Sequence, residues 1–372
     1  MRIAMLGHKR MPSREGGVEI VVEELAVRMV ERGHEVTVYN RSGHHVSGRE
    51  FDEKRGASYK GVKLKTVPAI HIKGIAAMTA SAIASLCAAL GRYDVVHFHT
   101  EGPCATLWLT KMLGKRCVVT VHGLDHQRSK WGRFARTYIL LGEKCAVRFA
   151  DEIIVLSRSV QEYFAERYHR QTRLIPNGVT RPETRAADEI TKEFGLQKDG
   201  YILYLGRITP EKGIHDLIEA YRMLKTDKKL VIAGGSSDSD AYFGELRKLV
   251  ECDDNVLFTG FVQGKLLEEL YSNAYIYVLP SELEGMPLSL LEAMSYGNCC
   301  VVSDISECKD VVGEMGVVFP RRDIKALSVS LQRLCDSPQI VGAYRENAAD
   351  YVCSRYNWDS VVEDTMACYQ LR

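Results

Sequence analysis

The sequence lacks a charge excess, a cysteine motif and a strongly apolar segment, and each absence excludes a class of protein. Its 49 basic and 48 acidic side chains leave a net charge of +1, which argues against a nucleic-acid partner. The 11 cysteines show no Cys-x-x-Cys spacing, so neither a zinc ribbon nor a disulfide framework fits, and reduced thiols are expected. Average hydrophobic and charged shares, 46% and 26%, exclude long disorder and collagen-like or coiled-coil chains.

A targeting signal is also missing from the pattern. Residues 1–7 hold a short apolar run that turns basic without a cleavage-site pattern, so a cytoplasmic protein is expected. The longest uncharged run, residues 74–91, has the length of a membrane span. It consists mostly of Ala, Ser, Thr and Gly, so a helix packed within the fold is the favoured interpretation.

The near-zero net charge conceals an asymmetry between the two halves. Residues 1–180 hold 28 Lys and Arg against 17 Asp and Glu, a net charge of +11. Residues 181–372 hold 21 against 31, a net charge of −10. This division indicates a basic first lobe that meets something anionic.

Short β-rich runs alternate with helical patterns, and this rhythm runs through the chain twice. It predicts parallel sheets with helices on both faces, and therefore two Rossmann-like α/β domains facing across a cleft. The expected strands are 3–6, 35–39, 62–67, 95–98, 117–121, 153–156 and 173–175 in the first half, and 201–205, 229–233, 256–259, 276–279 and 300–303 in the second.

A turn signal, Pro176-Asn177-Gly178, and a polar stretch after it mark the hinge. The predicted domains are therefore 1–180 and 181–355. Residues 356–372 are predicted to form a last amphipathic helix that packs back on the first domain. Ligands in such folds bind at the carboxyl ends of the strands.

One such strand end begins the segment from Gly206 to Gly213, which reads Gly-Arg-Ile-Thr-Pro-Glu-Lys-Gly. Gly206 allows a tight turn, and Arg207 and Lys212 are placed to converge on one anion near a helix N-terminus. A diphosphate is the obvious ligand. Seen alone, the segment is better explained as a turn with a solvated Arg and Lys.

The second segment runs from Glu284 to Ala293 and follows the strand 276–279. Gly285 allows close backbone approach, and Pro287 suits the first turn of a helix. Carboxylates accept hydrogen bonds from vicinal hydroxyls, so Glu284 and Glu292 are candidates for holding a sugar and a ribose. The alternative is one Glu that compensates the helix dipole and one exposed helical Glu.

Together these segments resemble the retaining glycosyltransferases of the GT-B fold, the family 4 enzymes that use nucleotide-sugars. The resemblance covers nearly the whole chain and is most specific at Gly206 to Gly213 and at the Glu–seven residues–Glu pattern. The first half adds Gly16-Gly17, the strand end 94–99 and the segment 120–123.

The resemblance implies roles for particular residues. Arg207 and Lys212 would neutralise the donor diphosphate, Glu292 would hold the ribose, and Glu284 would contact the donor sugar. The backbone of Gly285, Met286, Pro287 and Leu288 would lie beside the donor sugar, and Phe261-Val262 would line the base pocket. Gly16 and Gly17 would form the loop where phosphate and acceptor approach, and His122 would lie at the reaction centre. No enzymic nucleophile is assigned.

Three features of the sequence qualify this interpretation. Met286-Pro287 stands where many relatives have Phe-Gly, so one backbone N–H donor is missing beside the donor sugar. No G-x-G-x-x-G follows the first strand, which disfavours a dinucleotide dehydrogenase. Asp238-Ser239-Asp240 resembles a metal-diphosphate triplet but is expected to cap a helix, so no metal and no cofactor are predicted.

Two further patterns leave alternatives open. His97 and His99 share one strand face and are expected to line a cleft rather than bind metal. The helical stripe Trp131, Phe134, Tyr138, Leu141 and Cys145 is expected to face the core. The alternative is a surface that docks on anionic lipid, because Lys130, Arg133, Arg136, Lys144 and Arg148 lie on the adjacent sector.

The resemblance implies an enzyme that moves a sugar from a nucleotide-diphosphate sugar, with a UDP-sugar favoured, to a glycan or lipid-linked acceptor in cell-surface polysaccharide or glycolipid synthesis. Reversible contact with the inner face of an anionic membrane is a further expectation. A sugar-nucleotide epimerase, a glycan phosphorylase and a non-catalytic nucleotide-sugar-binding subunit remain as alternatives. An epimerase needs no acceptor, a phosphorylase needs free phosphate, and a binding subunit releases no nucleotide when acceptor is added.

Overall fold

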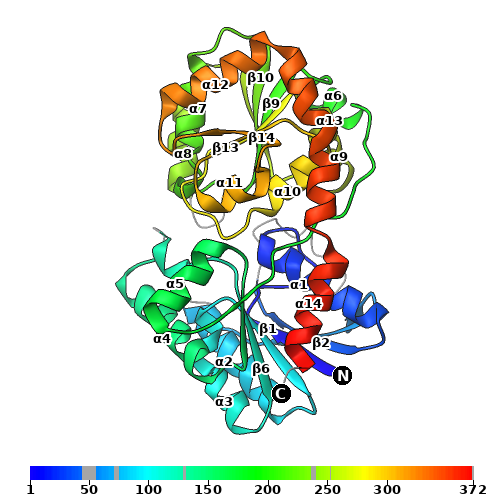
Figure 1. Cartoon of the computed structure of the whole chain (residues 1–372), viewed down its shortest axis with the longest axis vertical. Helices are drawn as coiled ribbons and strands as arrows, with labels where there is room; N and C mark the ends of the chain where they lie inside the picture. The colour runs from blue at the N-terminus through cyan, green and yellow to red at the C-terminus, as the bar shows by residue number, and fades with distance from the viewer. Residues whose placement is uncertain (44–55, 71–74, 129–130, 236–239, 252, 371–372) are drawn as a thin grey trace. The chain divides into compact units, whose positions relative to one another are not determined.

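The computed structural model describes residues 1–43, 56–70, 75–128, 131–235, 240–251 and 253–370. It divides into two units of sheet and helices (Figure 1), the first made of Met1–Asn177 and Trp358–Arg372 and the second of Gly178–Asn357. The chain leaves the first unit at Asn177, close to the boundary at 180 expected from the sequence, and the last helix belongs to the first unit.

The first unit is built on an eight-stranded sheet with the order β3-β4-β2-β1-β5-β6-β7-β8, in which only the β3–β4 pair is antiparallel. Its strands are β1 (Arg2–Leu6), β2 (Glu35–Arg41), β3 (Ser58–Tyr59), β4 (Val62–Val67), β5 (Val95–His99), β6 (Arg116–Val121), β7 (Glu152–Val155) and β8 (Arg173–Leu174). Its helices are α1 (Gly17–Glu31), α2 (Ile75–Leu90), α3 (Leu107–Met112), α4 (Arg133–Phe149), α5 (Arg158–Tyr168) and α14 (Trp358–Gln370), with two 3-10 turns, η2 (Gly102–Thr106) and η3 (Asp125–Gln127).

The second unit is built on a parallel six-stranded sheet with the order β11-β10-β9-β12-β13-β14. Its strands are β9 (Tyr201–Leu205), β10 (Lys229–Ala233), β11 (Val256–Gly260), β12 (Ile276–Leu279), β13 (Cys300–Ser303) and β14 (Gly316–Phe319). Its helices are α6 (Glu189–Phe194), η4 (Pro210–Lys212), α7 (Ile214–Arg222), α8 (Asp240–Leu249), α9 (Gly264–Asn273), α10 (Leu288–Ser295), α11 (Ser306–Val312), α12 (Ile324–Asp336) and α13 (Pro338–Arg355).

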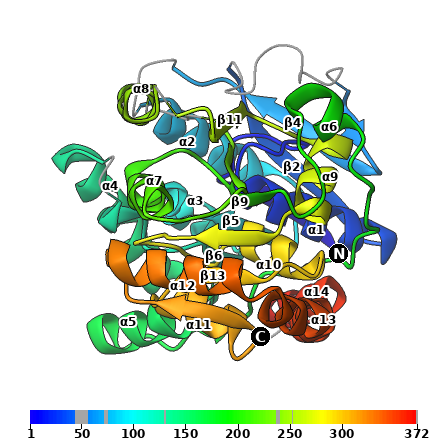
Figure 2. The same cartoon turned by 90° about the horizontal axis from the view of Figure 1, so that it is seen from above.

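Helices cover both faces of each sheet, as Figures 1 and 2 show. In the first unit α2, α3, α4 and α5 lie on one side of the strands, and α1 and α14 lie on the other. This burial on both faces explains why the strands read as continuous apolar runs rather than as alternating patterns. The two-domain Rossmann-like α/β fold expected from the sequence is confirmed.

The strand order reverses beside the first strand of each unit. In the first unit this point lies between β1 and β5, and in the second it lies between β9 and β12. Loops leave neighbouring parallel strands in opposite directions there, which opens a crevice outside the carboxyl ends of the strands. The loops that carry most of the predicted site residues follow these strands.

Residues 75–90 of the uncharged run form α2, whose small side chains pack on the sheet. Ala80, Ala84 and Ala88 belong to the hydrophobic core of the first unit, while Leu86 and Leu90 on the opposite side are exposed. Among the described residues no helix is long and apolar enough to cross a membrane. The ten cysteines in the described part of the chain are all free thiols.

The core interpretation of the stripe on α4 is wrong for two of its members, because Phe134 is 72% exposed and Leu141 is 51% exposed. The buried face of α4 consists instead of Ile139, Gly142, Glu143 and Ala146. A Cβ added at Gly142 would lie 2.0 Å from the backbone oxygen of Glu101. The close approach of α4 to η2 therefore turns the glycine face inward, and the larger apolar side chains face outward.

The last helix, α14, is tied to the first unit by polar contacts along its length. The carboxylate of Asp359 pairs with Arg28 on α1 and with Arg32, the residue that caps the end of α1. Near the other end, the Tyr369 hydroxyl lies 2.7 Å from Nδ1 of the buried His97. The final residues of the helix thus complete the hydrogen bonding of a strand in the middle of the sheet.

Candidate functional site

The candidate site in the second unit begins with a close approach at its switch point. Gly213 has a φ of +65°, and a Cβ at this position would lie 2.3 Å from the backbone oxygen of Pro280. Only glycine combines this left-handed backbone with such close contact. The turn after β9 is therefore held directly against the loop after β12, and the two predicted segments meet.

This contact places Lys212 and Glu284 in a direct ion pair between the Lys212 ammonium and the Glu284 carboxylate. The same carboxylate oxygen accepts a hydrogen bond of 2.6 Å from the Ser281 hydroxyl. The Lys212 and Glu284 side chains are only 12% and 8% exposed. A buried ion pair of this kind is destabilised strongly if one partner is removed, so each residue positions the other.

Arg207 and Glu211 belong to the same cluster, around the hydroxyl of Tyr204. Burial raises the pKa of Tyr204 well above its usual value; the nearby carboxylates of Glu284 and Glu211 raise it further, whereas Arg207 lowers it. The Tyr204 hydroxyl donates to the backbone oxygen of Arg207 at 2.8 Å, which fixes the turn that carries the guanidinium. The sequence assigned no role to Glu211, whose two buried carboxylate oxygens make no hydrogen bond within the described residues.

Glu292 lies on α10, and its carboxylate is held by a tyrosine from the preceding helix. The Tyr271 hydroxyl donates to Oε2 of Glu292 at 3.0 Å, and the Tyr271 ring stacks on Tyr296 at a centroid distance of 5.3 Å. Pro287 is the N-cap of α10 and Leu288 its first residue, so Gly285 and Met286 lie just before the helix N-terminus. Glu284 and Glu292 therefore flank the start of one helix.

The segments after the neighbouring strands meet at the same sheet edge. The backbone of Gly206 donates to the oxygen of Ala233 at the end of β10, and Gly234 donates to the oxygen of Gly260 at 2.8 Å. Val262, expected at a base pocket, follows directly and is buried. The predicted residues of the second unit thus follow the carboxyl ends of three strands, β9, β11 and β12.

In the first unit Gly16 is the N-cap of α1 and Gly17 its first residue. The Glu19 carboxylate folds back over this end, because a Cβ at Gly16 would lie 2.5 Å from Oε2 of Glu19. Its other oxygen accepts the backbone N–H of Lys9 at 2.9 Å. A carboxylate already occupies the anion-attracting end of α1, so this loop favours a hydroxyl over a phosphate.

His122 follows β6, is partly buried, and adjoins two fully buried imidazoles, those of His99 and His97. Its Nε2 lies 3.0 Å from Nδ1 of His99, and the His99 ring lies 4.2 Å from that of His97. Burial lowers the pKa of His122 to about 4 and that of His97 to about 3, and it lowers the pKa of His99 well below its usual value. His97 and His99 are fully buried, so the prediction that they line a cleft is wrong.

The sequence missed the residues that hold the predicted ones. Tyr271 lies on α9 and Ser281 follows β12, and neither position carries a pattern that distinguishes it from an ordinary core or loop residue. The one available signal is position, because Ser281 lies two residues after the predicted strand end at 279. Asp238 and Ser239 lie outside the described residues, and Asp240 is the first residue of α8.

Comparison with protein families gives two matches that together span most of the chain. Residues 15–181 match the model described as Glycosyltransferase Family 4, and residues 187–351 match the one described as Glycosyl transferases group 1. The two matched ranges follow the two units of the structure.

Individual relatives agree in length with this chain. An uncharacterized glycosyltransferase of Methanocaldococcus jannaschii is 27% identical over all of this chain and 98% of its own length. The sucrose-phosphate synthase of Thermosynechococcus elongatus superposes with a TM-score of 0.80 at 23% identity, over 99% of this chain and 98% of its own. An Anabaena protein solved in complex with UDP-glucose gives a TM-score of 0.80 at 18% identity, over 99% of both chains.

The histidine chain predicts how the stability of the first unit depends on pH. His97, His99 and His122 have folded-state pKa values below the unfolded value of about 6.5, so the unfolded chain binds more protons in mildly acidic solution. Their contribution is complete above pH 6.5 and falls as the pH drops towards 4, by up to about 1.4 kcal/mol per pH unit for each histidine.

Urea unfolding between pH 7.5 and 5 measures this dependence. Tryptophan fluorescence reports on the first unit, because Trp108, Trp131 and Trp358 all belong to it. His122→Gln should reduce the pH dependence of the free energy of unfolding by the equivalent of about one proton. His169→Gln, at an exposed position, should leave that pH dependence unchanged. A free energy of unfolding that stays constant from pH 7.5 to 5 would contradict the assignment.

Proposed function

The chain belongs to the family 4 glycosyltransferases and has the GT-B fold, and we propose that it transfers a hexose from a nucleotide-diphosphate sugar, with retention of anomeric configuration, to a glycan or lipid-linked acceptor. The observation that carries this proposal is the cluster of Arg207, Lys212 and Glu284 at the switch point of the second unit. It combines cations for a diphosphate with a carboxylate for sugar hydroxyls in one place.

The donor is assigned to the second unit. Arg207 and Lys212 stabilise the charge that develops on the leaving diphosphate, in a preorganised and largely buried setting. Glu284 accepts from hydroxyls of the donor sugar, Glu292 accepts from the ribose, and Val262 borders the base. A UDP-sugar is favoured, and the UDP-glucose bound to the structurally similar Anabaena protein supports a donor of this class.

The diphosphate needs no metal ion in this proposal, because two cationic side chains replace the usual divalent cation. Activity is therefore independent of added Mg²⁺ or Mn²⁺, and the Asp238-Ser239-Asp240 triplet is dispensable. The neighbouring carboxylate of Glu284 limits how much positive charge Lys212 offers, so Arg207 is the main contact of the diphosphate.

The acceptor is assigned to the first unit. Gly16 and Gly17 border the loop where an acceptor hydroxyl approaches, and the Glu19 carboxylate is a hydrogen-bond acceptor for it. His122, with its pKa lowered to about 4, is neutral at physiological pH. It therefore serves as a hydrogen-bonding group at the reaction centre and not as a fixed charge.

The surface of the first unit supports a membrane-bound acceptor. Large apolar side chains are exposed on the neighbouring helices α2, α3 and α4 and at the residue that caps the end of α3. They are Leu86, Leu90, Trp108, Met112, Leu113, Phe134 and Leu141. Arg133, Arg136, Lys144 and Arg148 are exposed on α4, whose only acidic residue, Glu143, is buried. Such a surface suits the headgroup region of an anionic leaflet.

This surface places the enzyme reversibly at the inner face of the membrane, in the synthesis of cell-surface polysaccharide or glycolipid. Trp131 is partly buried, so Phe134 is the exposed aromatic ring of α4 that inserts into the bilayer. The basic charge of residues 1–180, a net of +11, adds long-range attraction to anionic lipid.

The two glutamates predict different kinetic effects. Glu292→Gln should weaken the binding of UDP about tenfold, because the ribose is present in donor and product alike. Glu284→Gln should not weaken UDP binding, because it removes the carboxylate that limits the positive charge of Lys212. It should lower kcat, because the sugar is present only in the donor. Isothermal titration with UDP and turnover with UDP-sugars measure both effects, after a thermal-shift screen of UDP-, GDP- and dTDP-sugars identifies the donor.

Both substitutions keep an amide oxygen that accepts hydrogen bonds, so the contacts with Tyr271 and Lys212 can persist. Glu314→Gln is the matched control, since this exposed glutamate lies in the same unit outside the cluster. A greater loss of UDP affinity in Glu284→Gln than in Glu292→Gln would reverse the two roles. Turnover of donor without any acceptor would indicate an epimerase instead.

The membrane surface predicts sedimentation with anionic vesicles at low salt and release as the salt rises, because screening weakens the contribution of each basic residue, about 1 kcal/mol. Neutral vesicles should leave the protein in the supernatant. Arg133→Glu combined with Arg136→Glu should abolish the binding, and Phe134→Ser should weaken the salt-insensitive part.

Lys325→Glu combined with Arg333→Glu is the matched control, because it makes the same charge change at exposed positions of the second unit. If the wild-type protein ignores anionic vesicles, or if both double variants lose binding equally, the surface is not a lipid contact. A soluble acceptor would then be the better assignment.

A further inference from the structure

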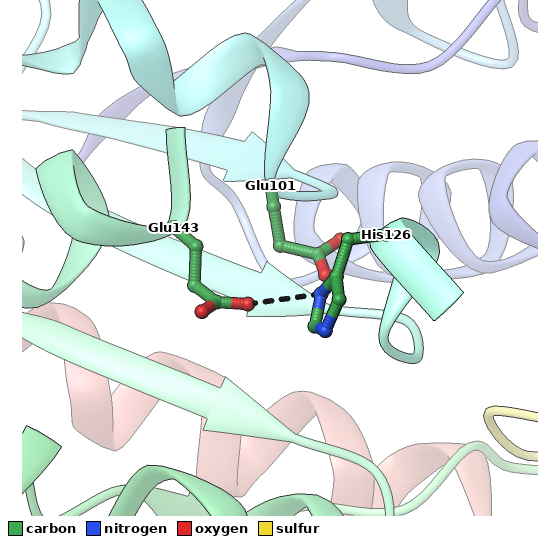
Figure 3. A group of neighbouring side chains, drawn as sticks. All are labelled: Glu101, His126 and Glu143. Carbon is green, nitrogen blue, oxygen red and sulfur yellow. Dashed lines mark ion pairs between the residues drawn. The ribbon is translucent and has the colours of Figure 1, made fainter. Parts of the chain in front are cut away.

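Three buried polar side-chain atoms without hydrogen bonds converge in the first unit. They are Oε2 of Glu101, Nδ1 of His126 and Oε2 of Glu143, and none makes a hydrogen bond within the described residues. Figure 3 shows the three side chains pointing towards one another: Glu101 from the position just before η2, His126 from η3 and Glu143 from α4. One potential ligand atom from each lies within 4.8 Å of the others.

Backbone packing fixes this convergence. Gly142 lets α4 approach the backbone oxygen of Glu101, where any larger residue would clash. The next residue along α4 is Glu143, which therefore points towards the segment that carries Glu101. The loop after β6 brings His126 to the third side. Glu101 and Glu143 are fully buried, and His126 is 16% exposed.

The remaining oxygen of each carboxylate is held by other groups. Oε1 of Glu101 accepts the backbone N–H of Asp125 at 3.1 Å. Oε1 of Glu143 accepts the Tyr163 hydroxyl at 2.9 Å and also the Tyr168 hydroxyl. Each carboxylate is thus oriented by one oxygen and leaves the other directed into the common space, an arrangement typical of oriented metal ligands.

The distance between two of these atoms has a specific meaning. Nδ1 of His126 and Oε2 of Glu143 lie 3.4 Å apart, within ion-pair range but without a hydrogen bond. Two ligands that each lie about 2.1 Å from a tetrahedral metal are separated by about 3.4 Å. The pair is therefore spaced as two ligands of one ion would be.

We propose that Glu101, His126 and Glu143 bind one divalent transition-metal ion of the zinc class, with a water molecule as fourth ligand. Imidazole with carboxylate suits zinc and its neighbours in the first transition row. Calcium requires six to eight oxygen ligands and magnesium an octahedral set, so neither matches three converging atoms. The ion also removes the cost of leaving buried polar atoms without partners.

The ion links three separate segments of the first unit and so has a structural role. It joins η2, η3 and α4 at the carboxyl ends of β5 and β6, and η3 begins shortly after His122. The residues proposed for the donor diphosphate belong to the second unit. Metal content and stability therefore test this site, whereas activity without added Mg²⁺ tests the diphosphate assignment.

A shared proton is the competing explanation of the same geometry. Burial, followed by the nearby Asp125 carboxylate, raises the pKa of Glu101 well above its usual value. Burial also acts to raise the pKa of Glu143, but the neighbouring His126 and the hydrogen bonds from Tyr168 and Tyr163 outweigh it and lower that pKa. A neutral Glu101 beside an ionised Glu143 would place a proton, rather than a metal, among the three residues.

Metal titration of the full-length protein distinguishes the two explanations. Protein stripped by prolonged dialysis against a strong chelator should take up about one equivalent of Zn²⁺, measured by elemental analysis after equilibrium dialysis. Co²⁺ should give the intense visible absorption of four-coordinate cobalt. Mg²⁺ and Ca²⁺ should compete with neither ion.

Zn²⁺ should also raise the midpoint of thermal unfolding, followed by tryptophan fluorescence, by about 5–10 °C at a hundredfold excess over its Kd. This measurement uses the wild-type protein alone, so it stands even if a variant fails to fold. The three tryptophans belong to the unit that contains the site.

Glu143→Gln and Glu101→Gln should each lower Zn²⁺ affinity at least a hundredfold and remove the cobalt absorption. Glu166→Gln is the matched control, because Glu166 is exposed on α5 of the same unit. Absence of bound Zn²⁺ in the wild-type protein would overturn the proposal, as would equal affinity in Glu143→Gln and Glu166→Gln. The shared proton would be the correct explanation if the protein binds no Zn²⁺ and Glu101→Gln stabilises it in the absence of metal.

Discussion

The buried ion pair between Lys212 and Glu284 is the interaction on which the site of the second unit depends. It forms because Gly213 has the left-handed conformation that lets the turn after β9 lie against Pro280. Without this approach the turn and the loop after β12 would be separate surface features. With it, a cation, a carboxylate and the guanidinium of Arg207 share one largely buried place at a topological switch point.

Much of the fold is predictable from the sequence because parallel strands buried on both faces have a strong local pattern. The expected strands 62–67, 201–205, 229–233, 276–279 and 300–303 have the observed bounds, and the rest differ by one or two residues at their ends. Strand β14 and helices α6, α11 and α13 of the second unit were not anticipated. Short strands such as Gly316–Phe319 carry too little periodicity to stand out.

The positions of the candidate site residues were predictable, but their partners were not. Arg207, Lys212, Glu284 and Glu292 lie on turns whose motifs are contiguous in the sequence. The contact between Lys212 and Glu284, and the support of Glu292 by Tyr271, join residues from different elements and leave no local pattern. The prediction that the apolar stripe of α4 faces the core failed for a related reason. The contact that decides the inward face of α4 is a close approach at Gly142 to the backbone of Glu101.

The central claim is that this cluster binds the diphosphate of a sugar nucleotide, and the most direct measurement is the affinity for UDP compared with UMP in Arg207→Ala. This variant is preferable to one at Lys212, since it leaves the ion pair with Glu284 in place. A charged hydrogen bond contributes roughly 1.5–3 kcal/mol, so UDP affinity should fall about tenfold to a hundredfold while UMP affinity changes little. Arg333→Ala, at an exposed position of the same unit, should leave both affinities unchanged. Equal losses for UDP and UMP in Arg207→Ala, or no loss for UDP, would contradict the assignment.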